Sequence, residues 1–472
     1  MIRLTCLAAV GLWWTCLPYD GKTQVPTDTI GNTPVVITTV LDSTHFLNGT
    51  PSLGGYDSGP WDLYWGPDNH LWYSNKRSIE KWNPITGLKK TLFTGSNGYV
   101  LGIAAHSDFA NQPYVYAAID TGNYYAASSK IELWRFEYSF SGDTLFNPQL
   151  LLNWSHPGEH SGGRVVFGQD DKVYVSTAEY WAQNDTLFNN SGKILRINPD
   201  GSVPVDNPGM DYTYTKGHRN PQGLTQVPSG NIFSSEHGQI FGNDELNLIQ
   251  AGGHYGWAIF DGNFCLNNVD TCNYYFPSLT FPLNTGNNPP SGIDYYSHAA
   301  IPEFNGIIEA VTGNNQGIIA YALNNSMDSV ISKNRYLYAL LPNGNISSFS
   351  TFGRIRDVCS APDGSVYFIA RDRNYPRIMK IFNPLFSSAD DQAADHFSAN
   401  AFPNPFTNTV TIHGSQSELS ASIIIRDILG RVIAASSPVN GTVIFDTSNW
   451  QSGVYFIDSE DLSVRCQKLV KL

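Results

Sequence analysis

Charged residues are scarce in this sequence of 472 residues, and basic residues are scarcer than acidic ones. Only 15% of the residues are Asp, Glu, Lys or Arg, whereas about a quarter is usual in soluble domains. The 28 Lys and Arg residues are outnumbered by 41 Asp and Glu residues, which gives a formal net charge of -13. Because phosphate binding needs clustered basic side chains, this balance argues against a nucleic-acid-binding protein.

Long hydrophobic runs are also missing. No stretch reaches the roughly 18 consecutive apolar residues that a membrane-spanning helix needs, so we expect no membrane span. The N-terminus has one basic residue, Arg3, followed by a short apolar run over residues 4–17. That layout predicts a secretory signal peptide over residues 1–22. The alternative is a buried N-terminal strand or helix.

Cysteine is rare, with six residues in the whole chain, and no Cys-His cluster has the spacing of a zinc site. Cys6 and Cys16 lie within the predicted signal peptide. Cys265 and Cys272 flank a short polar loop, which in an exported protein predicts a local disulfide. Two free thiols are the alternative. Cys359 lies in an apparent strand and is interpreted as a core residue rather than a nucleophile.

Turn-forming and aromatic residues are abundant instead. The chain has 42 Gly, 27 Pro and 13% aromatic residues, a mixture typical of an all-β protein rich in turns. A unit of strand, turn and strand recurs along residues 55–386. It occurs clearly at residues 61–72, 164–175, 223–233 and 356–368 and more weakly at residues 101–118 and 317–341. Six such units predict a six-bladed β-propeller, with a large β-sandwich as the second choice.

The predicted propeller leaves residues 23–54 as an N-terminal extension. Three of the units contain a strand followed by Asn-Pro, at Asn83, Asn198 and Asn383. Long insertions at residues 180–191 and 261–300 are expected to shape the mouth of the central channel.

The C-terminal part changes character near Ser387. Residues 387–398 are small and polar, which predicts a linker, and residues 399–472 contain short alternating strands typical of a small β-sandwich. This segment resembles the C-terminal sorting domain of the type IX secretion system of Bacteroidetes in four motifs, at residues 403–406, 427–431, 453–455 and 468–472. The resemblance implies a secretion-machinery partner and a protein secreted by, or held on the surface of, a Gram-negative bacterium.

Three arginine-containing clusters begin at or just before predicted inner strands, which line the axis of a propeller. They lie at residues 160–164, 217–223 and 354–357. Strand alternation places Arg354 and Arg356 on one face. Because arginine grips carboxylates with two hydrogen bonds, arginines that converge on an axis predict an anion site. The alternative is that they pair with acidic residues and fix the blades together, the candidates being Asp357, Asp244 and Glu245.

A fourth cluster is rich in oxygen ligands. It spans residues 236–245 and is followed by residues 253–257. Acidic side chains and turn carbonyls suit calcium, although an Asp-Glu pair in a loop is commonly a solvated turn.

These clusters together resemble the glucose/sorbosone dehydrogenase family over roughly residues 55–385. The motifs that carry the resemblance are Leu101-Gly-Ile-Ala104, His160-x-Gly-Gly-Arg164, Gly192-Lys-Ile-Leu-Arg-Ile-Asn-Pro-Asp-Gly201, Gly217-His-Arg-Asn-Pro-Gln-Gly-Leu224, Glu236-His-Gly238, Asp244-Glu-x-Asn247, Tyr255-Gly-Trp257 and Arg354-x-Arg-Asp357. The resemblance implies a soluble sugar dehydrogenase with a six-bladed propeller that uses pyrroloquinoline quinone (PQQ) and Ca²⁺.

The resemblance also implies a reaction and a role for particular residues. His160 would be the general base that takes the proton from the C1 hydroxyl of an aldose, and a lactone would be the product. The cofactor would be held by Arg219, Asn220, Arg354 and Arg356. Calcium would be bound by carbonyl oxygens of Gly238 and Gln239, with a further calcium site at Glu245 and, through its backbone, Tyr255.

The sequence departs from the family pattern at several places, two of which concern cofactor binding, and it leaves other functions open. Residues 281–292 contain no Trp where the family usually has one, and residues 341–343 contain no Lys where one often contacts the cofactor. The alternative function is a non-catalytic propeller that binds glycan or protein at the cell surface. A calcium-dependent hydrolase such as a lactonase would need carboxylates on the axis, where the sequence offers arginines.

Overall fold

A computed structural model of the chain describes most of the predicted propeller and parts of the C-terminal segment. The described residues are 28–46, 59–96, 98–121, 130–155, 160–180, 190–239, 243–262, 264–266, 280–282, 289–312, 317–337, 352–372, 375–386, 400–402, 406–413, 422–427, 431–439, 442–459 and 467–471. The predicted signal peptide and linker lie outside them, as do residues 341–343. The chain divides into two compact units, one within Val25–Leu385 and the other including Phe386–Leu472.

The prediction of an all-β fold is confirmed over the described residues. Their only helical elements are α1 (Ser43–Phe46) and a short 3-10 helix, η1 (Pro302–Phe304). Within the same residues, none of the helices has the length and the apolar character that crossing a bilayer requires.

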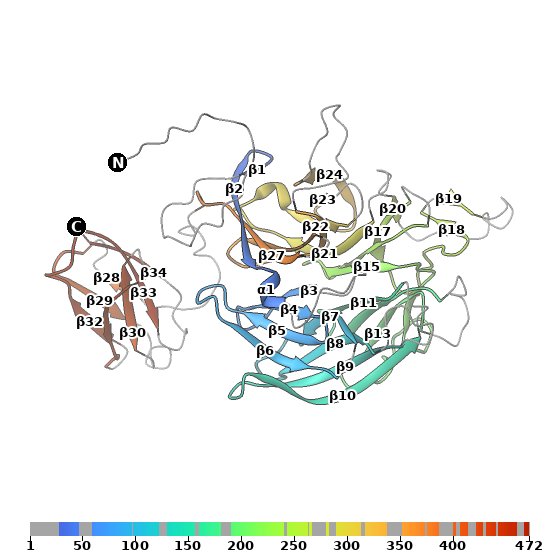
Figure 1. The fold of residues 1–472 in the computed structure, drawn as a ribbon, viewed down its shortest axis with the longest axis horizontal. Helices are drawn as coiled ribbons and strands as arrows, with labels where there is room; N and C mark the ends of the chain where they lie inside the picture. Colours follow the sequence, from blue (N-terminus) through green and yellow to red (C-terminus); the bar gives the residue numbers. More distant parts are fainter. Residues whose placement is uncertain are drawn as a thin grey trace, which may run out of the picture. The chain divides into compact units, whose positions relative to one another are not determined.

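Within the described residues, the larger unit contains six antiparallel sheets of four or five strands (Figure 1). In sequence order, the first three are β3 (Pro60–Trp65), β4 (Leu71–Asn75), β5 (Ser78–Trp82) and β6 (Lys89–Thr94); β7 (Tyr99–Ala105), β8 (Tyr114–Asp120), β9 (Lys130–Ser139) and β10 (Thr144–Ser155); and β11 (Gly162–Phe167), β12 (Val173–Thr177), β13 (Lys193–Ile197) and β14 (Thr213–Lys216). The next two are β15 (Pro221–Gln226), β16 (Ile232–Glu236), β17 (Glu245–Ile249) and β20 (Thr280–Pro282); and β21 (Pro290–Tyr296), β22 (Gly306–Val311), β23 (Gly317–Leu323) and β24 (Val330–Tyr336). The sixth combines β25 (Arg354–Ser360), β26 (Val366–Asp372) and β27 (Tyr375–Phe382) with β2 (Thr33–Leu41) and β1 (Asp28–Ile30).

The first strand of each sheet contacts the first strand of the next, and the series closes on itself. The contacts run from β3 through β7, β11, β15, β21 and β25, and β25 contacts β3 again. The N-terminal strand β2 pairs with β27, so that Val36 faces Phe382. Part of the stretch predicted as an N-terminal extension therefore lies in the last sheet, where it joins the two ends of the ring.

Local sequence accounts for many strand boundaries. The third strands β5, β13 and β27 each end one residue before an Asn-Pro pair. After β5, the Asn83 side chain accepts hydrogen bonds from the backbone N–H groups of Ile85 and Thr86, at 2.8 and 2.9 Å. An asparagine that bonds the backbone two residues ahead forms a turn and competes with strand pairing, so the strand stops there.

The fifth sheet begins earlier than the sequence repeat predicts. The weak unit expected from Gly317 corresponds to β23 and β24, whereas the inner strand is β21, inside the predicted insertion of residues 261–300. The residues Pro290, Ser291 and Gly292 are typical of a turn rather than of a strand. They lie at the start of β21, where the pairing of this strand with β22 is irregular between Pro290 and Ile293.

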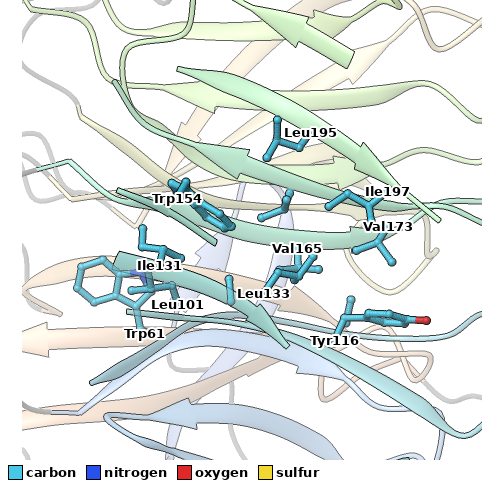
Figure 2. Packing of buried hydrophobic residues seen from close by; sticks show 13 residues of the cluster. Trp61, Leu101, Tyr116, Ile131, Leu133, Trp154, Val165, Val173, Leu195 and Ile197 are labelled. Carbon is cyan, nitrogen blue, oxygen red and sulfur yellow. The ribbon is translucent and has the colours of Figure 1, made fainter. Parts of the chain in front are cut away.

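The apolar cores lie between neighbouring sheets rather than in one central mass. Figure 2 shows one of them, where side chains of the second and third sheets interdigitate beside Trp61 of β3. Its members include Leu133, Trp154, Val175 and Ile197. Similar clusters lie between other neighbouring sheets of the described residues. Burial of one large apolar side chain contributes roughly 1.5–3 kcal/mol, so these interfaces hold the ring together.

The smaller unit contains two antiparallel sheets within the described residues. Their strands are β28 (Asn400–Phe402), β29 (Thr409–His413) and β32 (Thr442–Asp446), and β31 (Val432–Ser436), β30 (Ile423–Asp427), β33 (Gly453–Ser459) and β34 (Gln467–Lys471). One apolar cluster draws Val410 and Phe445 from the first sheet and Ile425 and Ile457 from the second. The two sheets therefore pack against each other.

Candidate active site

Irregular pairing at the start of every inner strand shapes the centre of the ring. The register shifts between Pro60 and Leu63, Val100 and Gly102, Gly162 and Val165, Pro221 and Gly223, Pro290 and Ile293, and Ile355 and Val358. A β-bulge breaks the strict alternation of a strand and re-aims its side chains. Trp61, Arg164 and Arg356 all lie within these shifted segments.

Serine hydroxyls from the second strands satisfy the backbone groups that the bulges free. Ser74 accepts hydrogen bonds from the N–H groups of Trp61 and Asp62, at 3.1 and 3.0 Å, and Ser176 accepts one from Arg164 at 3.1 Å. Because a buried N–H without a partner is destabilising, these serines stabilise the bulged conformation.

The predicted base, His160, lies just before β11 and pairs with a carboxylate that follows β12. Its Nδ1 is 3.0 Å from Oε1 of Glu179, whose other oxygen accepts the indole N–H of Trp257 at 2.7 Å. Burial alone would raise the pKa of the Glu179 carboxyl. The hydrogen bonds from His160 and Trp257 outweigh burial, and that pKa lies below its usual range. An ionised Glu179 accepts Nδ1–H, so the lone pair of His160 is on Nε2.

Arg219 lies beside this pair, in the loop before β15. Its Nε is 3.7 Å from Oε1 of Glu179, and its Nη1 donates to the carbonyl oxygens of His237 and Gly238 at 3.2 and 2.9 Å. The guanidinium also lies over the ring of Trp257, with 5.3 Å between Cζ and the ring centroid. These contacts fix the direction of a partly buried cation next to the predicted base.

Asn220 is held through both ends of its amide. Its Nδ2 lies 3.3 Å from Nδ1 of His237, and its Oδ1 accepts a hydrogen bond from Gln222 at 2.9 Å. His237 Nε2 donates to the carbonyl of Pro290 at 2.6 Å. Burial lowers the pKa of His237 to about 3, and nearby arginines add to the effect, so this ring is neutral and its Nδ1 accepts from Asn220.

The arginines of the sixth sheet are not equivalent. The Cζ atom of Arg356 lies 3.4 Å from the ring centroid of Trp61, and the residue is half-buried. Arg354 is exposed, although the strand alternation of the sequence places it on the same face. The reason is the register shift between Ile355 and Val358, which alternation alone does not reveal.

Arg164 has the structural role that was the alternative to an anion site: it pairs with acidic residues and joins the sheets. Its guanidinium is buried and forms ion pairs with Asp62 of β3 and Asp357 of β25, the latter at 3.1 Å. Its Nε donates to the carbonyl of Gln222 in β15 at 2.7 Å, so one side chain links four sheets. A Cβ on Gly292 would lie 1.4 Å from Oδ1 of Asp357, so only glycine leaves room for this carboxylate.

Two of the groups predicted to bind calcium, the Gly238 carbonyl and the Glu245 carboxylate, have other partners in the described geometry. The carbonyl of Gly238 accepts from Arg219, and the N–H of Gln239 donates to Asp261 at 2.7 Å. Glu245 accepts from the N–H of Gly262 at 2.7 Å and from Asn247 at 2.9 Å. Burial, with the neighbouring Glu236 adding to it, raises the pKa of Glu245.

Tyr255 is buried, and its hydroxyl accepts from the N–H of Gln250 at 3.0 Å. Over the part of the chain that the structure describes, His, Cys, Asp and Glu side chains form no group of three or more able to hold a metal. The geometry therefore does not show a calcium site.

The cysteine predictions have separate outcomes. Cys359 is a buried free thiol, which confirms its interpretation as a core residue. Cys265 ends the short strand β19 (Phe264–Cys265), which pairs with β18 (Phe260–Asp261). Cys272 lies outside the described residues, and the disulfide stays a prediction.

Sequence reasoning missed three residues of this cluster: Glu179, Trp257 as a hydrogen-bond donor, and Trp61. The sequence held one signal for Glu179. His160 comes just before the first strand of a repeat unit, and Glu179 comes just after the second strand of the same unit. Trp257 was visible only as the last residue of a motif. Nothing in the sequence pairs Trp61 with Arg356.

Comparison with known proteins identifies relatives for both units. Residues 58–380 match the family model of glucose/sorbosone dehydrogenase, and residues 400–471 match that of the secretion system C-terminal sorting domain. Quinoprotein glucose dehydrogenase B of Acinetobacter calcoaceticus is 36% identical over 239 residues, which are 42% of this chain. The match spans only 50% of that relative's length.

Two further relatives match over a larger share of their length. The aldose sugar dehydrogenase of Escherichia coli K12 is 25% identical over 358 residues, which are 68% of this chain and 89% of that protein. The PQQ-bound aldose sugar dehydrogenase of Streptomyces coelicolor has a similar fold, with a TM-score of 0.54 and 24% identity over 74% of this chain and 98% of its own.

Proposed function

The chain belongs to the glucose/sorbosone dehydrogenase family, and from this premise we propose that it is an exported quinoprotein oxidoreductase. It oxidises the C1 hydroxyl of an aldose-type sugar to a lactone, with PQQ as the hydride acceptor. The observation that carries the proposal is the pair of His160 and Glu179, 3.0 Å apart, beside Arg219 in the same polar cluster. The sorting-domain match over residues 400–471 supports export by type IX secretion.

The residues of the cluster fit PQQ, which is a planar quinone with three carboxylates. Arg219 and Arg356 each have the guanidinium fork that suits a carboxylate. Trp61 and Trp257 lie against these two guanidinium groups and hold them in place. Asn220 is fixed at both ends of its amide. PQQ, when bound, supplies the two-electron acceptor that the side chains of a protein lack.

The chain's own residues supply the proton chemistry. The His160 Nδ1–H is donated to Glu179, which leaves the lone pair on Nε2 to accept the proton of the sugar hydroxyl. As imidazole becomes imidazolium, the carboxylate of Glu179 stabilises the new charge. The sugar thereby loses one proton to His160 and one hydride from C1. Removal of these two hydrogens converts the C1 hydroxyl into the carbonyl of a lactone.

Six sheets in a closed series support a six-bladed propeller as the architecture of this unit. The packed sheets of the smaller unit support a small β-sandwich. Calcium stays a prediction from the family resemblance. In the described geometry the Gly238 carbonyl faces the guanidinium of Arg219, and no step is derived through a metal ion.

Turnover by the full chain tests the proposed function. The protein is incubated with PQQ and CaCl₂ and then titrated with a panel of aldoses, while reduction of a redox dye is followed. We expect saturable turnover with at least one aldose and none without PQQ. Binding of PQQ without turnover of any aldose would contradict the proposed reaction and favour a surface-binding role. Omitting calcium, or adding EDTA before PQQ, shows separately whether loading of the cofactor needs the ion.

Cofactor affinity is expected to depend on Arg356. The change Arg356→Gln removes the half-buried guanidinium that lies over Trp61. Loss of a charge-assisted hydrogen bond to a carboxylate corresponds to about 1.5–3 kcal/mol, so the Kd for PQQ should rise roughly 10- to 100-fold. The measurement is a titration of the cofactor-free protein with PQQ.

Two comparisons sharpen this result. The exposed Arg77, on the loop before β5, serves as the control, and Arg77→Gln should leave the Kd unchanged. Arg354→Gln should raise the Kd only about threefold, because an exposed ion pair contributes at most about 1 kcal/mol. Equal losses for Arg354→Gln and Arg356→Gln would show that the unequal exposure of the two side chains does not decide cofactor binding.

A further inference from the structure

Trp257 contacts both the His160–Glu179 pair and Arg219, each through a different part of its side chain. Its indole N–H donates to Oε2 of Glu179 at 2.7 Å, and the other oxygen of that carboxylate meets His160. Its ring lies under the guanidinium of Arg219, 5.3 Å from Cζ. Trp257 is only 8% exposed, so both interactions are shielded from water. The neutral side chain neither accepts a proton nor pairs with an anion itself.

The backbone fixes the position of Trp257 relative to the loop that carries Arg219. The N–H groups of Tyr255 and Trp257 donate to the carbonyls of Lys216 and Gly217, at 2.9 and 3.0 Å. The residue before it, Gly256, has φ of 98°, and a Cβ there would lie 2.8 Å from Cβ of Phe260. The segment that places the indole is therefore held to the Arg219 loop.

We propose that Trp257 is a positioning residue that couples the base to the cofactor-binding arginine. The N–H holds the Glu179 carboxylate in the orientation in which its other oxygen meets His160. The ring holds the guanidinium of Arg219 toward the carboxylate-binding side of the site. This inference rests on the proposed function, and it assigns separate tasks to two parts of one indole.

The two tasks can be separated by substitution. Trp257→Phe keeps an aromatic ring beneath Arg219 but removes the N–H. Loss of a hydrogen bond to a charged, buried carboxylate should lower kcat about tenfold, while the Kd for PQQ stays within about threefold of wild type. Trp257→Leu removes the ring as well and should also raise the Kd about tenfold, because a shielded cation–π contact contributes on the order of 1–2 kcal/mol.

The experiment uses the full chain and measures kcat by dye reduction and the PQQ Kd by titration of the cofactor-free protein. The matched control is Trp154→Phe in β10, a 3%-exposed tryptophan of the core in Figure 2 whose indole N–H has no hydrogen-bond partner among the described residues. It should change neither quantity. In a Glu179→Gln background, Trp257→Phe should lower kcat by less than about twofold further, because the N–H acts through that carboxylate.

The possible outcomes are distinct. A Trp257→Phe variant that loses no more kcat than Trp154→Phe overturns the inference. The inference is also overturned if kcat and PQQ affinity fall together in Trp257→Phe, because that is the effect of a structural residue alone. If wild-type protein binds PQQ but oxidises no aldose, the proposed reaction fails, and the Kd ratio of the Leu and Phe variants still decides the Arg219 half. Wild-type protein that binds no PQQ overturns both.

Discussion

Replacing His160 by alanine should lower kcat about a thousandfold while PQQ remains bound. The variant removes the imidazole that we propose as the general base, whose Nδ1 lies 3.0 Å from Oε1 of Glu179. General-base catalysis contributes typically about 100- to 10,000-fold. The neighbouring His237 has partners on both of its ring nitrogens. The measurement is dye reduction at saturating aldose and PQQ.

The control for this prediction is His70→Ala. His70 is half-buried beside Asp68, with Nδ1 2.7 Å from the Asp68 carbonyl in the turn between β3 and β4, and its loss should leave kcat unchanged. A His160→Ala variant that keeps more than about a tenth of the activity would mean that another group takes the proton. If His160→Ala abolishes PQQ binding as well, His160 is a cofactor ligand, and the proposed role is wrong.

Replacing Arg164 by methionine should have the largest effect on stability. Its guanidinium is buried between Asp62 and Asp357, and burial raises the pKa of both carboxyls although Arg164 opposes the shift. Removing one partner from a buried ion pair costs about 3–5 kcal/mol, because the remaining charges stay buried without compensation. We therefore expect the free energy of unfolding of the larger unit to fall by about that amount.

Urea-induced unfolding of the full chain, followed by tryptophan fluorescence, measures this change. Arg77→Met, at an exposed position, should alter stability by less than about 0.5 kcal/mol. If Arg164→Met does not fold, Arg164→Lys retains a charge and should show a smaller loss, about 1–3 kcal/mol, from the bonds that the guanidinium fork makes to several sheets. Stability of Arg164→Met within about 1 kcal/mol of wild type would contradict the role of Arg164 in joining the sheets.

Arg164 also illustrates where the sequence leaves two interpretations open. The cluster of residues 160–164 offers a histidine and an arginine four positions apart, and both are polar residues at the start of an inner strand. The structure gives them different roles, because the bulge between Gly162 and Val165 directs Arg164 toward Asp62 and Asp357. Strand periodicity cannot distinguish them, since a bulge inserts one residue and reverses the alternation that follows.

The repeat units were located more accurately where turn residues mark the ends of the strands. The units at residues 61–72, 164–175, 223–233 and 356–368 contain the paired strands β3 and β4, β11 and β12, β15 and β16, and β25 and β26. The fifth unit was misplaced because β21 begins with Pro-Ser-Gly, which is a turn signal in isolation. Only the pairing of β21 with β22 and its contact with β15 and β25 make it an inner strand.

The sequence by itself determined that this chain is an acidic all-β protein with a repeated strand unit, a C-terminal sorting domain and a family-typical set of histidine and arginine residues. These properties reside in composition, in turn residues and in short motifs, which act over a few positions. The tertiary structure decided which side chains meet. Glu179 and Trp257 are 78 positions apart, and Arg164 and Asp357 are 193 apart. Such contacts form only when the sheets close into a ring and each inner strand bulges at its start.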